Sequence, residues 1–432
     1  MSRGATALHI GSFAASVRRL APSIQIQTEG LDPYAIDGVA PLLAVRAKSA
    51  DDVRVILTEA HNNAAAVVPR GGGQHVGMAN GPARYDVALL LDGVDRVLAH
   101  EPADMTVMVE PGVRLADLQQ RLAQHGQFLP LDPAAGAAAT IGGVLAANAS
   151  GPLRHAFGTA RDWLIGVRVV HGDGSASKSG GRVVKNVAGY DMHKLHVGAH
   201  GTLGVIVEAT FKLAPLPTAR RTLVVSCASP RAACEVALAA WDAGLALRRL
   251  EVLSPAMSAT LAGDGVWTLL VETAGGAGAV DRSERDLRSM AASRGAGVAA
   301  IDDVVWSRWS QEFRPRDLAL RVTVLPSQVG TAILAIAGAA SPSVALSATV
   351  AAGVVRARIG SLDDDAAVAL VERLRPVLPQ DAALAVESAS PAVKRAIDVF
   401  GPTRADFAIM RSLKEQFDPR GVLAPGRFLG RL

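Results

Sequence analysis

The chain contains very little cysteine. Its 432 residues include only Cys227 and Cys234. Two cysteines cannot build a disulfide framework, and seven residues apart they match neither a zinc ribbon nor a four-cysteine iron–sulfur site. We therefore expect two buried thiols. Any iron–sulfur cluster that serves this protein must be bound by another chain.

Aromatic residues and excess charge are also scarce. Phe, Trp and Tyr make up 4% of the chain, so it has few aromatic platforms for stacking on single-stranded bases. The formal net charge is +4, and no run of basic residues is longer than two. A charge so small and so dispersed is a poor electrostatic footprint for nucleic acid. Nucleic acid is therefore not an expected partner.

Long hydrophobic runs are missing as well. The longest stretch without a charged side chain, Val322–Val355, is interrupted by prolines and glycines and predicts strand, helix, turn and strand. We therefore expect no transmembrane segment. Residues 1–23 contain three arginines, and no acidic residue occurs before Glu29. This pattern is typical of a short helix that leads into the fold, and a targeting segment is the alternative.

Histidine is absent from more than half of the chain, because all ten histidines lie within the first 200 residues. The remainder therefore lacks a histidine for metal binding or general-base catalysis. His193, His196 and His200 have a spacing of i, i+3 and i+7, which would place them on one helix face. Gly198 interrupts this segment, so we expect no metal site there.

Short β-branched strands alternate with Ala/Leu-rich helices over about residues 36–211. Residues 41–47 and 64–70 predict two strands, and the segment between them predicts a helix capped by Ser49 or Asp51. A unit of strand, helix and strand predicts two parallel strands in one sheet. The sequence therefore indicates a mixed α and β fold for this part of the chain.

A double proline break at Pro215-Leu216-Pro217 marks an expected domain boundary. The pattern beyond it predicts a second α+β domain with one antiparallel sheet. Its predicted strands and helices lie at residues 222–227, 230–243, 248–253, 266–272 and 281–292. We expect four parts, namely an N-terminal arm (1–35), a first domain (36–217), a second domain (218–390) and a C-terminal segment (391–432).

A glycine-rich loop follows the second predicted strand. Its sequence is Pro69-Arg70-Gly71-Gly72-Gly73-Gln74-His75-Val76-Gly77. Consecutive glycines let backbone N–H groups approach an anionic phosphate with no Cβ in the way. The loop matches neither the P-loop motif nor the Rossmann motif. It is a candidate phosphate-binding loop, and a plain tight turn is the alternative.

Further stretches of small residues follow in order along the chain. They are Thr140-Ile141-Gly142-Gly143, Asn148 to Gly151, Phe157-Gly158 to Asp162, and Lys185 to Ile206. Together with the glycine loop they resemble the FAD-binding domain of the vanillyl-alcohol oxidase and p-cresol methylhydroxylase superfamily. Within it, the segments Gly180–Ile206 and Met410–Phe428 resemble the FAD-binding E subunits of bacterial glycolate oxidases. The resemblance covers about residues 36–217 and the last 20 residues best.

The resemblance implies an α+β fold. It consists of a two-part FAD-binding domain of the p-cresol methylhydroxylase type, a smaller α+β cap domain with an antiparallel sheet, and a C-terminal segment that returns to the FAD domain. The implied cofactor-binding residues are Pro69, Arg70, Gly71, Gly72, Gly73, Gln74, His75, Gly77, Thr140, Ile141, Gly142, Gly143, Asn148, Gly151, Gly158, Asp162, Gly201, Gly204, Val205 and Ile206. Asp162 and Asp191 are expected to pin loops rather than to touch the cofactor.

The mode of FAD attachment follows from one position. In relatives whose FAD is bonded to a histidine of the first loop, that histidine directly follows Arg-x-Gly-Gly. In this chain Gln74 follows Arg70-Gly71-Gly72-Gly73, and His75 is one place further on. We therefore expect non-covalent FAD.

The implied activity is that of a glycolate oxidase subunit, which oxidises glycolate to glyoxylate. The implied partners are a larger FAD-containing catalytic subunit, an iron–sulfur subunit that receives the electrons, and a small 2-hydroxy-acid substrate. We expect a cytoplasmic location, with any association with the inner membrane made through partner chains. A non-catalytic electron-relay or scaffold subunit and an independent alcohol oxidase are the alternatives.

Two departures from the family bear on this choice. Ala424 stands where the turn near the C-terminus usually carries Asn, and the second domain has no histidine-rich segment.

Arg321 lies where related 2-hydroxy-acid dehydrogenases place a cation that faces the flavin, and a guanidinium group can hold a carboxylate through two hydrogen bonds. Arg356 and Arg358 share one face of the next strand as a second choice. Solvated strand faces are the alternative for all three.

Overall fold

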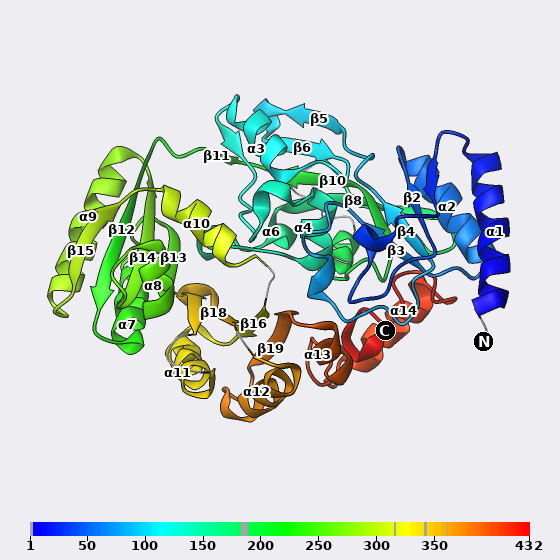
Figure 1. Cartoon of the computed structure of the whole chain (residues 1–432). Coiled ribbons are helices and arrows are strands. Elements are labelled where there is room, and N and C mark those ends of the chain that lie inside the picture. The colour runs from blue at the N-terminus through cyan, green and yellow to red at the C-terminus, as the bar shows by residue number, and fades with distance from the viewer. Residues whose placement is uncertain (1–2, 183–188, 315–316, 341–343, 361) are drawn as a thin grey trace.

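The computed structural model describes residues 3–182, 189–314, 317–340, 344–360 and 362–432. The predicted cofactor segment around Lys185–Ala188 lies outside these residues. Figure 1 shows the first half of the chain on the right, the second half on the left and below, and α14 beneath the first half. The α+β fold class predicted from the sequence is confirmed.

A four-stranded sheet opens the fold, with the order β1-β2-β4-β3. Both β2 and β3 run parallel to β4, so they are parallel to each other as predicted, with β4 between them. The Ser49 hydroxyl accepts a hydrogen bond from the Asp52 N–H (3.1 Å), which confirms it as the helix cap. The strands are β1 (Gln25–Gln27), β2 (Leu43–Arg46), β3 (Val67–Arg70) and β4 (Val87–Leu90), and the helices are α1 (Arg3–Leu20) and α2 (Ala50–Asn62).

The short N-terminal helix predicted from the sequence is α1. Its Phe13 and Val17 side chains are fully buried and belong to the same core as Val53 and Leu57 of α2. Burial of such side chains contributes roughly 1.5–3 kcal/mol each. Because of this packing, α1 is fixed beside α2 at the edge of the first half (Figure 1).

A second, antiparallel sheet has the order β5-β6-β10-β8-β9. Its strands are β5 (Val97–Glu101), β6 (Thr106–Val109), β8 (Leu164–Val170), β9 (Ala176–Gly180) and β10 (Val205–Lys212), and β7 (Gln127–Phe128) pairs separately with β11 (Ala214–Pro215). The helices packed around it are α3 (Leu115–Ala123), α4 (Ile141–Ala147), α5 (Arg154–Phe157) and α6 (Ala160–Trp163). The first half of the chain thus contains two main sheets, and β1, which precedes the predicted start of the first domain at residue 36, belongs to the first of them.

The second half contains one eight-stranded sheet, with the order β15-β12-β14-β13-β17-β18-β16-β19. Every pairing in it is antiparallel, as the sequence predicted. The strands are β12 (Ala219–Cys227), β13 (Leu247–Leu253), β14 (Trp267–Gly275), β15 (Gly297–Ile301), β16 (Leu318–Thr323), β17 (Ala345–Thr349), β18 (Val354–Ile359) and β19 (Ala383–Ser388).

Helices cover both faces of this sheet. Leu223 and Val225 face one core, whereas Val224 faces the other, which is the alternation expected of a strand covered on both sides. One core takes side chains from α7 (Pro230–Asp242), α9 (Ala277–Ala292), α11 (Val329–Ala340) and α12 (Asp364–Val377), and the other from α8 (Pro255–Leu261) and α10 (Val304–Glu312). Cys227 and Cys234 are buried free thiols in the first of these cores, as expected.

The C-terminal segment, with α13 (Pro391–Ala396) and α14 (Phe407–Phe417), returns to the first half. The Val67 N–H donates to the Val422 carbonyl (2.7 Å), and the Ala424 N–H donates to the Val67 carbonyl (2.8 Å). The buried Asp418 carboxylate pairs with Lys414 (2.6 Å) and accepts the Val422 and Leu423 N–H groups. The segment therefore extends the first sheet beside β3.

Single-turn 3₁₀ helices complete the described elements. They are η1 (Asp32–Tyr34), η2 (Val76–Met78), η3 (Pro102–Asp104), η4 (Gly136–Ala138), η5 (Met192–His196), η6 (Pro326–Gln328), η7 (Val350–Ala352) and η8 (Leu429–Arg431). Among the described residues, the helices are either too short or too polar to cross a membrane.

Candidate functional site

The glycine loop after β3 forms one wall of a groove. Gly73 has a φ of +76°, a left-handed conformation that glycine adopts at little cost. The Gly72 N–H donates to the Thr140 hydroxyl (3.5 Å), and a Cβ at Gly72 would lie 2.6 Å from the Ala138 carbonyl oxygen. The loop backbone therefore packs directly against the segment before α4, which side chains would prevent.

Thr140 and the start of α4 form an adjoining wall. The Thr140 hydroxyl caps α4 by accepting the Gly143 N–H (3.4 Å). A Cβ at Gly142 would lie 2.7 Å from Pro111 Cβ, so α4 packs closely against the segment that contains Pro111. Small residues on this wall leave backbone exposed to whatever occupies the groove.

Residues 196–206 and Arg427 close the groove, which consists of two adjoining hollows of about 480 and 500 Å³. The predicted cofactor-binding residues that line it are Pro69, Arg70, Gly71, Gly72, Gly73, Gln74, His75, Thr140, Gly142, Gly143, Gly201, Gly204, Val205 and Ile206. Segments separated by more than 100 residues thus meet at one groove.

Six predicted cofactor-binding residues lie outside this lining, namely Gly77, Ile141, Asn148, Gly151, Gly158 and Asp162. Asn148 lines a neighbouring pocket instead, and Ile141 is fully buried in the core of the second sheet. The Gly77 carbonyl accepts a hydrogen bond from Lys394, and a Cβ at Gly151 would collide with Asp132. Close packing within the protein therefore explains Gly151, whereas a Cβ at Gly77 would meet only Lys394 Nζ at 3.8 Å, an ordinary contact.

Asp162 also lies outside the lining, and its contacts match the expected loop-pinning role. Its carboxylate accepts the Thr159 N–H (2.7 Å) and the Thr159 hydroxyl (3.1 Å) and so closes the turn that contains Gly158. Gly158 has a φ of +75°, and a Cβ there would collide with the same carboxylate. Asp191 pairs with Lys194 (2.5 Å).

Two arginines give one end of the groove an affinity for anions. Arg427 is 2% exposed, and its Nη2 donates to the Val76 carbonyl. Its Nε and Nη1, and Nη1 of Arg70, are buried and have no hydrogen-bond partner among the described residues. Burial lowers the pKa of Arg427 to about 10, so it remains a cation at neutral pH. Buried guanidinium groups with free donors beside a glycine loop fit a pyrophosphate.

The histidines of the groove are neutral at pH 7. Burial, together with the nearby cations Arg427 and Arg321, lowers the pKa of His200 to about 3. Burial lowers the pKa of His196 to about 4, and burial also lowers the pKa of His75. Neutral imidazoles can pack against an uncharged ring or accept a hydrogen bond.

A second pocket of about 550 Å³ adjoins the groove at His75. It lies between the two halves of the chain, and its lining includes Asn148, Ser150 and Arg154 from the first half and Arg321, Arg356 and Glu387 from the second. The structure thus brings the predicted Arg321 next to the groove. His75 supplies an imidazole to this pocket from the first half, although the second half has no histidine.

Arg358 is placed differently from its neighbour on β18. It pairs with Glu312 (2.9 Å) and does not belong to the pocket lining, whereas Arg356 does. Both arginines lie on β18, but only Arg356, which is nearer the middle of the strand, lines the pocket. Of the second-choice pair, the structure therefore brings Arg356, not Arg358, to Arg321.

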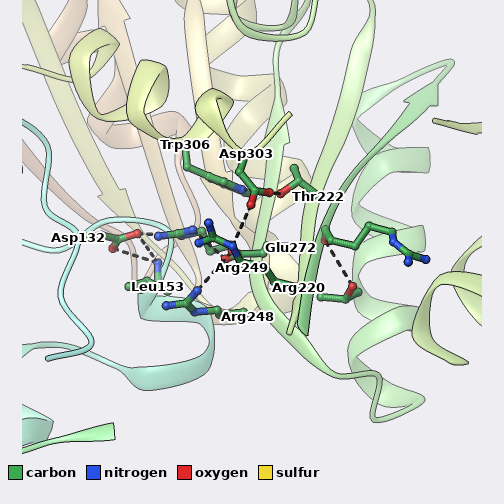
Figure 2. A network of polar contacts seen from close by, with 11 residues as sticks. Asp132, Leu153, Arg220, Thr222, Arg248, Arg249, Glu272, Asp303 and Trp306 are labelled. Atoms are coloured by element: carbon green, nitrogen blue, oxygen red, sulfur yellow. Dashed lines mark hydrogen bonds and ion pairs between the residues drawn. The ribbon is translucent and has the colours of Figure 1, made fainter. Parts of the chain in front are cut away.

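A network of buried charges joins the two halves beside this pocket (Figure 2). Asp132, from the loop before α4, accepts a hydrogen bond from Nε of Arg249 on β13 (3.0 Å) and from the Leu153 N–H (3.0 Å). Arg249 also pairs with the fully buried Glu272 (2.7 Å), which Arg248 approaches at 3.4 Å. We call Asp132, Arg249 and Glu272 the domain clasp.

Sequence reasoning missed several lining residues. Arg154, Glu387, His200 and Arg427 come from three separate parts of the chain and carry no local motif of their own. Arg427 lies inside the C-terminal segment that resembles the family, so that resemblance was the one signal for it. His200 likewise lies inside Gly180–Ile206, the other segment that resembles the family, whereas Arg154 and Glu387 were brought to the pocket only by folding.

Two segments that contribute to the groove match families of FAD-binding proteins. Residues 41–180 match the family described as FAD binding domain, and residues 402–428 match the family described as FAD linked oxidases, C-terminal domain. The first match contains the glycine loop and α4, and the second contains Arg427. The chain therefore carries an FAD-binding domain, and its cofactor is FAD.

Three curated relatives match parts of the chain. Glycolate oxidase subunit GlcD of Bacillus subtilis is 34% identical over 184 residues, which are 43% of this chain and 39% of that protein. The mitochondrial D-lactate dehydrogenase [cytochrome] of Arabidopsis thaliana is 35% identical over 215 residues (49% and 37%). Glycolate oxidase subunit GlcE of Escherichia coli is 38% identical over 128 residues (29% and 37%). The chain thus spans less than half the length of each relative.

Among solved structures, p-cresol methylhydroxylase with bound substrate shares the fold. The TM-score is 0.77 at 15% identity, and the match covers 99% of this chain and 97% of that one. This likeness confirms the predicted fold class. The resemblance to glycolate oxidase subunits is borne out, but both GlcD and GlcE match, so the narrower resemblance to GlcE stays a prediction.

Proposed function

We propose that this chain is the FAD-binding subunit of a 2-hydroxy-acid dehydrogenase complex. The observation that carries the proposal is the arginine-lined pocket between the two halves, which opens beside the FAD groove at His75. A guanidinium pair there suits a carboxylate, because Arg donates two parallel hydrogen bonds to it. The FAD family match and the relatives named for hydroxy-acid oxidation support the same class.

In this proposal the chain's own residues bind and orient the substrate. Arg321 and Arg356 hold its carboxylate, and the neutral imidazole of His75 lies where the pocket meets the groove. FAD, when bound, supplies the acceptor for the hydride that leaves the α-carbon of the substrate. Arg70, Arg427 and the glycine loop would hold its pyrophosphate, with no covalent link because Gln74 replaces the linking histidine.

Glycolate, oxidised to glyoxylate, is the substrate favoured by the similarity to glycolate oxidase subunits. The partners that we propose are a larger FAD-containing catalytic subunit and an iron–sulfur subunit that receives the electrons. Two cysteines in the whole sequence do not suffice for a cluster of its own. We propose a cytoplasmic location, with any association with the inner membrane made through these partners.

A second candidate is an electron-relay subunit whose partner carries out the oxidation. The absence of histidine after residue 200 favours it, because the second half then offers no imidazole base to the substrate.

The experiment is stopped-flow reduction of bound flavin by glycolate and by lactate. It is carried out on the isolated chain and on the chain with its partner subunits. We expect slow or no reduction of the isolated chain and a gain when the partners are present. Fast reduction of the isolated chain contradicts the relay function. No reduction by any 2-hydroxy acid, with or without partners, contradicts the dehydrogenase itself.

A further inference from the structure

The pocket beside the groove contains more positive charge than one carboxylate neutralises. Three guanidinium groups line it, those of Arg154, Arg321 and Arg356, against the single carboxylate of Glu387. Arg321 forms an ion pair with that carboxylate, with 2.7 Å between its Nε and Oε1 of Glu387. Two cations therefore remain without a carboxylate in the lining.

Arg356 is built into the pocket and is incompletely bonded. It is 4% exposed, and its Nη2 donates to the Ser150 carbonyl (2.8 Å) and approaches the Ser150 hydroxyl (3.3 Å). Its Nη1 is buried and has no hydrogen-bond partner among the described residues. An unpaired buried donor on a cation is costly, which a bound anion would relieve.

Arg321 and Arg356 lie directly opposite each other on β16 and β18. Like charges at opposed positions of an antiparallel pair repel each other, so this register is unfavourable until an anion lies between them. Glu387 offsets one of the two charges. The pair is therefore suited to a carboxylate held between the strands.

Arg154 approaches the same pocket from the first half of the chain. No hydrogen bond or ion pair joins its guanidinium group to another described residue. Burial lowers its pKa to about 10, and repulsion from Arg356 and Arg321 acts in the same direction, yet it stays charged at neutral pH. It supplies a second anion-binding group on the other wall.

The other charged groups around the pocket do not cancel this excess. Asp132 forms an ion pair with Arg249, and the Asp162 carboxylate accepts a hydrogen bond from the Thr159 N–H. Glu251 lies behind Arg356, and its fully buried carboxyl has a pKa raised to about 7, so it is partly protonated at neutral pH. His75 is neutral.

We propose that this pocket binds a 2-hydroxy acid that carries a second anionic group, with Arg321 and Arg356 on one carboxylate and Arg154 on the other group. The inference rests on the proposed function and replaces its favoured substrate, the monoanion glycolate, by a dianionic 2-hydroxy acid. The second group is a carboxylate or a phosphate ester, since a guanidinium group binds either.

The test is calorimetric binding to the FAD-loaded chain, which needs no turnover. Glutarate is compared with butyrate, so that a second carboxylate is the main difference. We expect glutarate to bind at least about tenfold more tightly, the effect of one charged hydrogen-bonding group. The preference should disappear in Arg154→Gln and return in Arg154→Lys. It should persist in Arg395→Gln, which removes an exposed arginine of α13.

Equal binding of the two acids, or loss of the preference in Arg395→Gln, overturns the inference. Flavin reduction by 2-hydroxyglutarate and by 3-phosphoglycerate then distinguishes a carboxylate from a phosphate ester as the second group. Tight glutarate binding, with no flavin reduction by either compound even when the partner subunits are present, leaves the dianion site standing and contradicts the proposed dehydrogenase. The two claims therefore fail separately.

Discussion

The glycines of the loop after β3 are required for two different physical reasons. Gly73 has a φ of +76°, where a side chain would strain the backbone. Gly72 has an ordinary backbone conformation, but a Cβ there would lie 2.6 Å from the Ala138 carbonyl oxygen. A substitution at Gly72 therefore acts by displacing the loop from the wall of the groove.

We predict that Gly72→Val removes most of the bound FAD. The added side chain pushes the loop away from Ala138 and withdraws its N–H groups from the phosphates. Flavin absorbance per protein chain measures the effect. Gly297→Val is the matched control, because a Cβ at Gly297 in β15 meets open space. Undiminished flavin in Gly72→Val would exclude the loop from the cofactor site.

A second residue-scale prediction concerns flavin attachment. Gln74 stands where some relatives carry the histidine that is bonded to FAD, so the purified protein should be yellow and should release its flavin on acid precipitation. The measurement is the partition of flavin between the supernatant and the pellet. Flavin that stays with the denatured chain would disprove non-covalent binding.

At the scale of elements, the pairing of β13 with β17 buries an acidic side chain. Glu251 is fully buried and accepts hydrogen bonds from the Ser347 and Thr349 hydroxyls. Burial raises its pKa to about 7, although both hydrogen bonds and Arg356 act in the opposite direction. A carboxyl with a higher pKa in the folded than in the unfolded state is protonated more in the folded state.

The raised pKa of Glu251 makes stability depend on pH. As the pH rises from the ordinary glutamate pKa of 4.5 to about 7, the folded state holds a proton that the unfolded state has lost, so the free energy of unfolding falls. The loss approaches about 3 kcal/mol. Thermal unfolding of wild type and Glu251→Gln between about pH 5 and 8 should show the variant gaining relative to wild type. Glu235→Gln, at an exposed position of α7, should show no such trend.

A constant difference in melting temperature between wild type and Glu251→Gln across this range would contradict the titration of a buried carboxyl.

At the scale of the whole molecule, the domain clasp of Asp132, Arg249 and Glu272 joins the two halves next to the proposed substrate pocket. The side chain of Arg249 is 13% exposed and that of Glu272 is fully buried. Removing Arg249 leaves two carboxylates without their main partner, and breaking a buried ion pair in this way costs about 3–5 kcal/mol.

We therefore predict that Arg249→Ala lowers the free energy of unfolding by about 3 kcal/mol. It should also increase amide exchange in the loop around Asp132 and in β13. Denaturant unfolding and hydrogen exchange measure the two effects. Arg282→Ala breaks an exposed pair with Asp286 on α9 and should change stability by less than about 1 kcal/mol. Equal effects of the two variants would mean that the clasp does not hold the halves together.

Much of this organisation could be predicted from the sequence because its determinants are local. Ser49 caps α2 because its side chain and the Asp52 N–H are only three residues apart. Gly71–Gly73 follow a strand directly and form the expected loop, and a short run of apolar residues, Leu223 to Val225, defines β12. The order of the flavin-type motifs pointed to FAD, which the family match bears out.

Only the tertiary structure decided which charged side chains meet. The sequence alone does not show that β4 lies between β2 and β3, that Arg356 opposes Arg321, or that Arg154 and Glu387 face the same pocket. Such contacts join residues up to about 230 positions apart, and their energies depend on burial and on neighbouring charges that exist only after packing. Local patterns specify the elements and the glycine loop, whereas the charge of the proposed substrate pocket is a property of the folded chain.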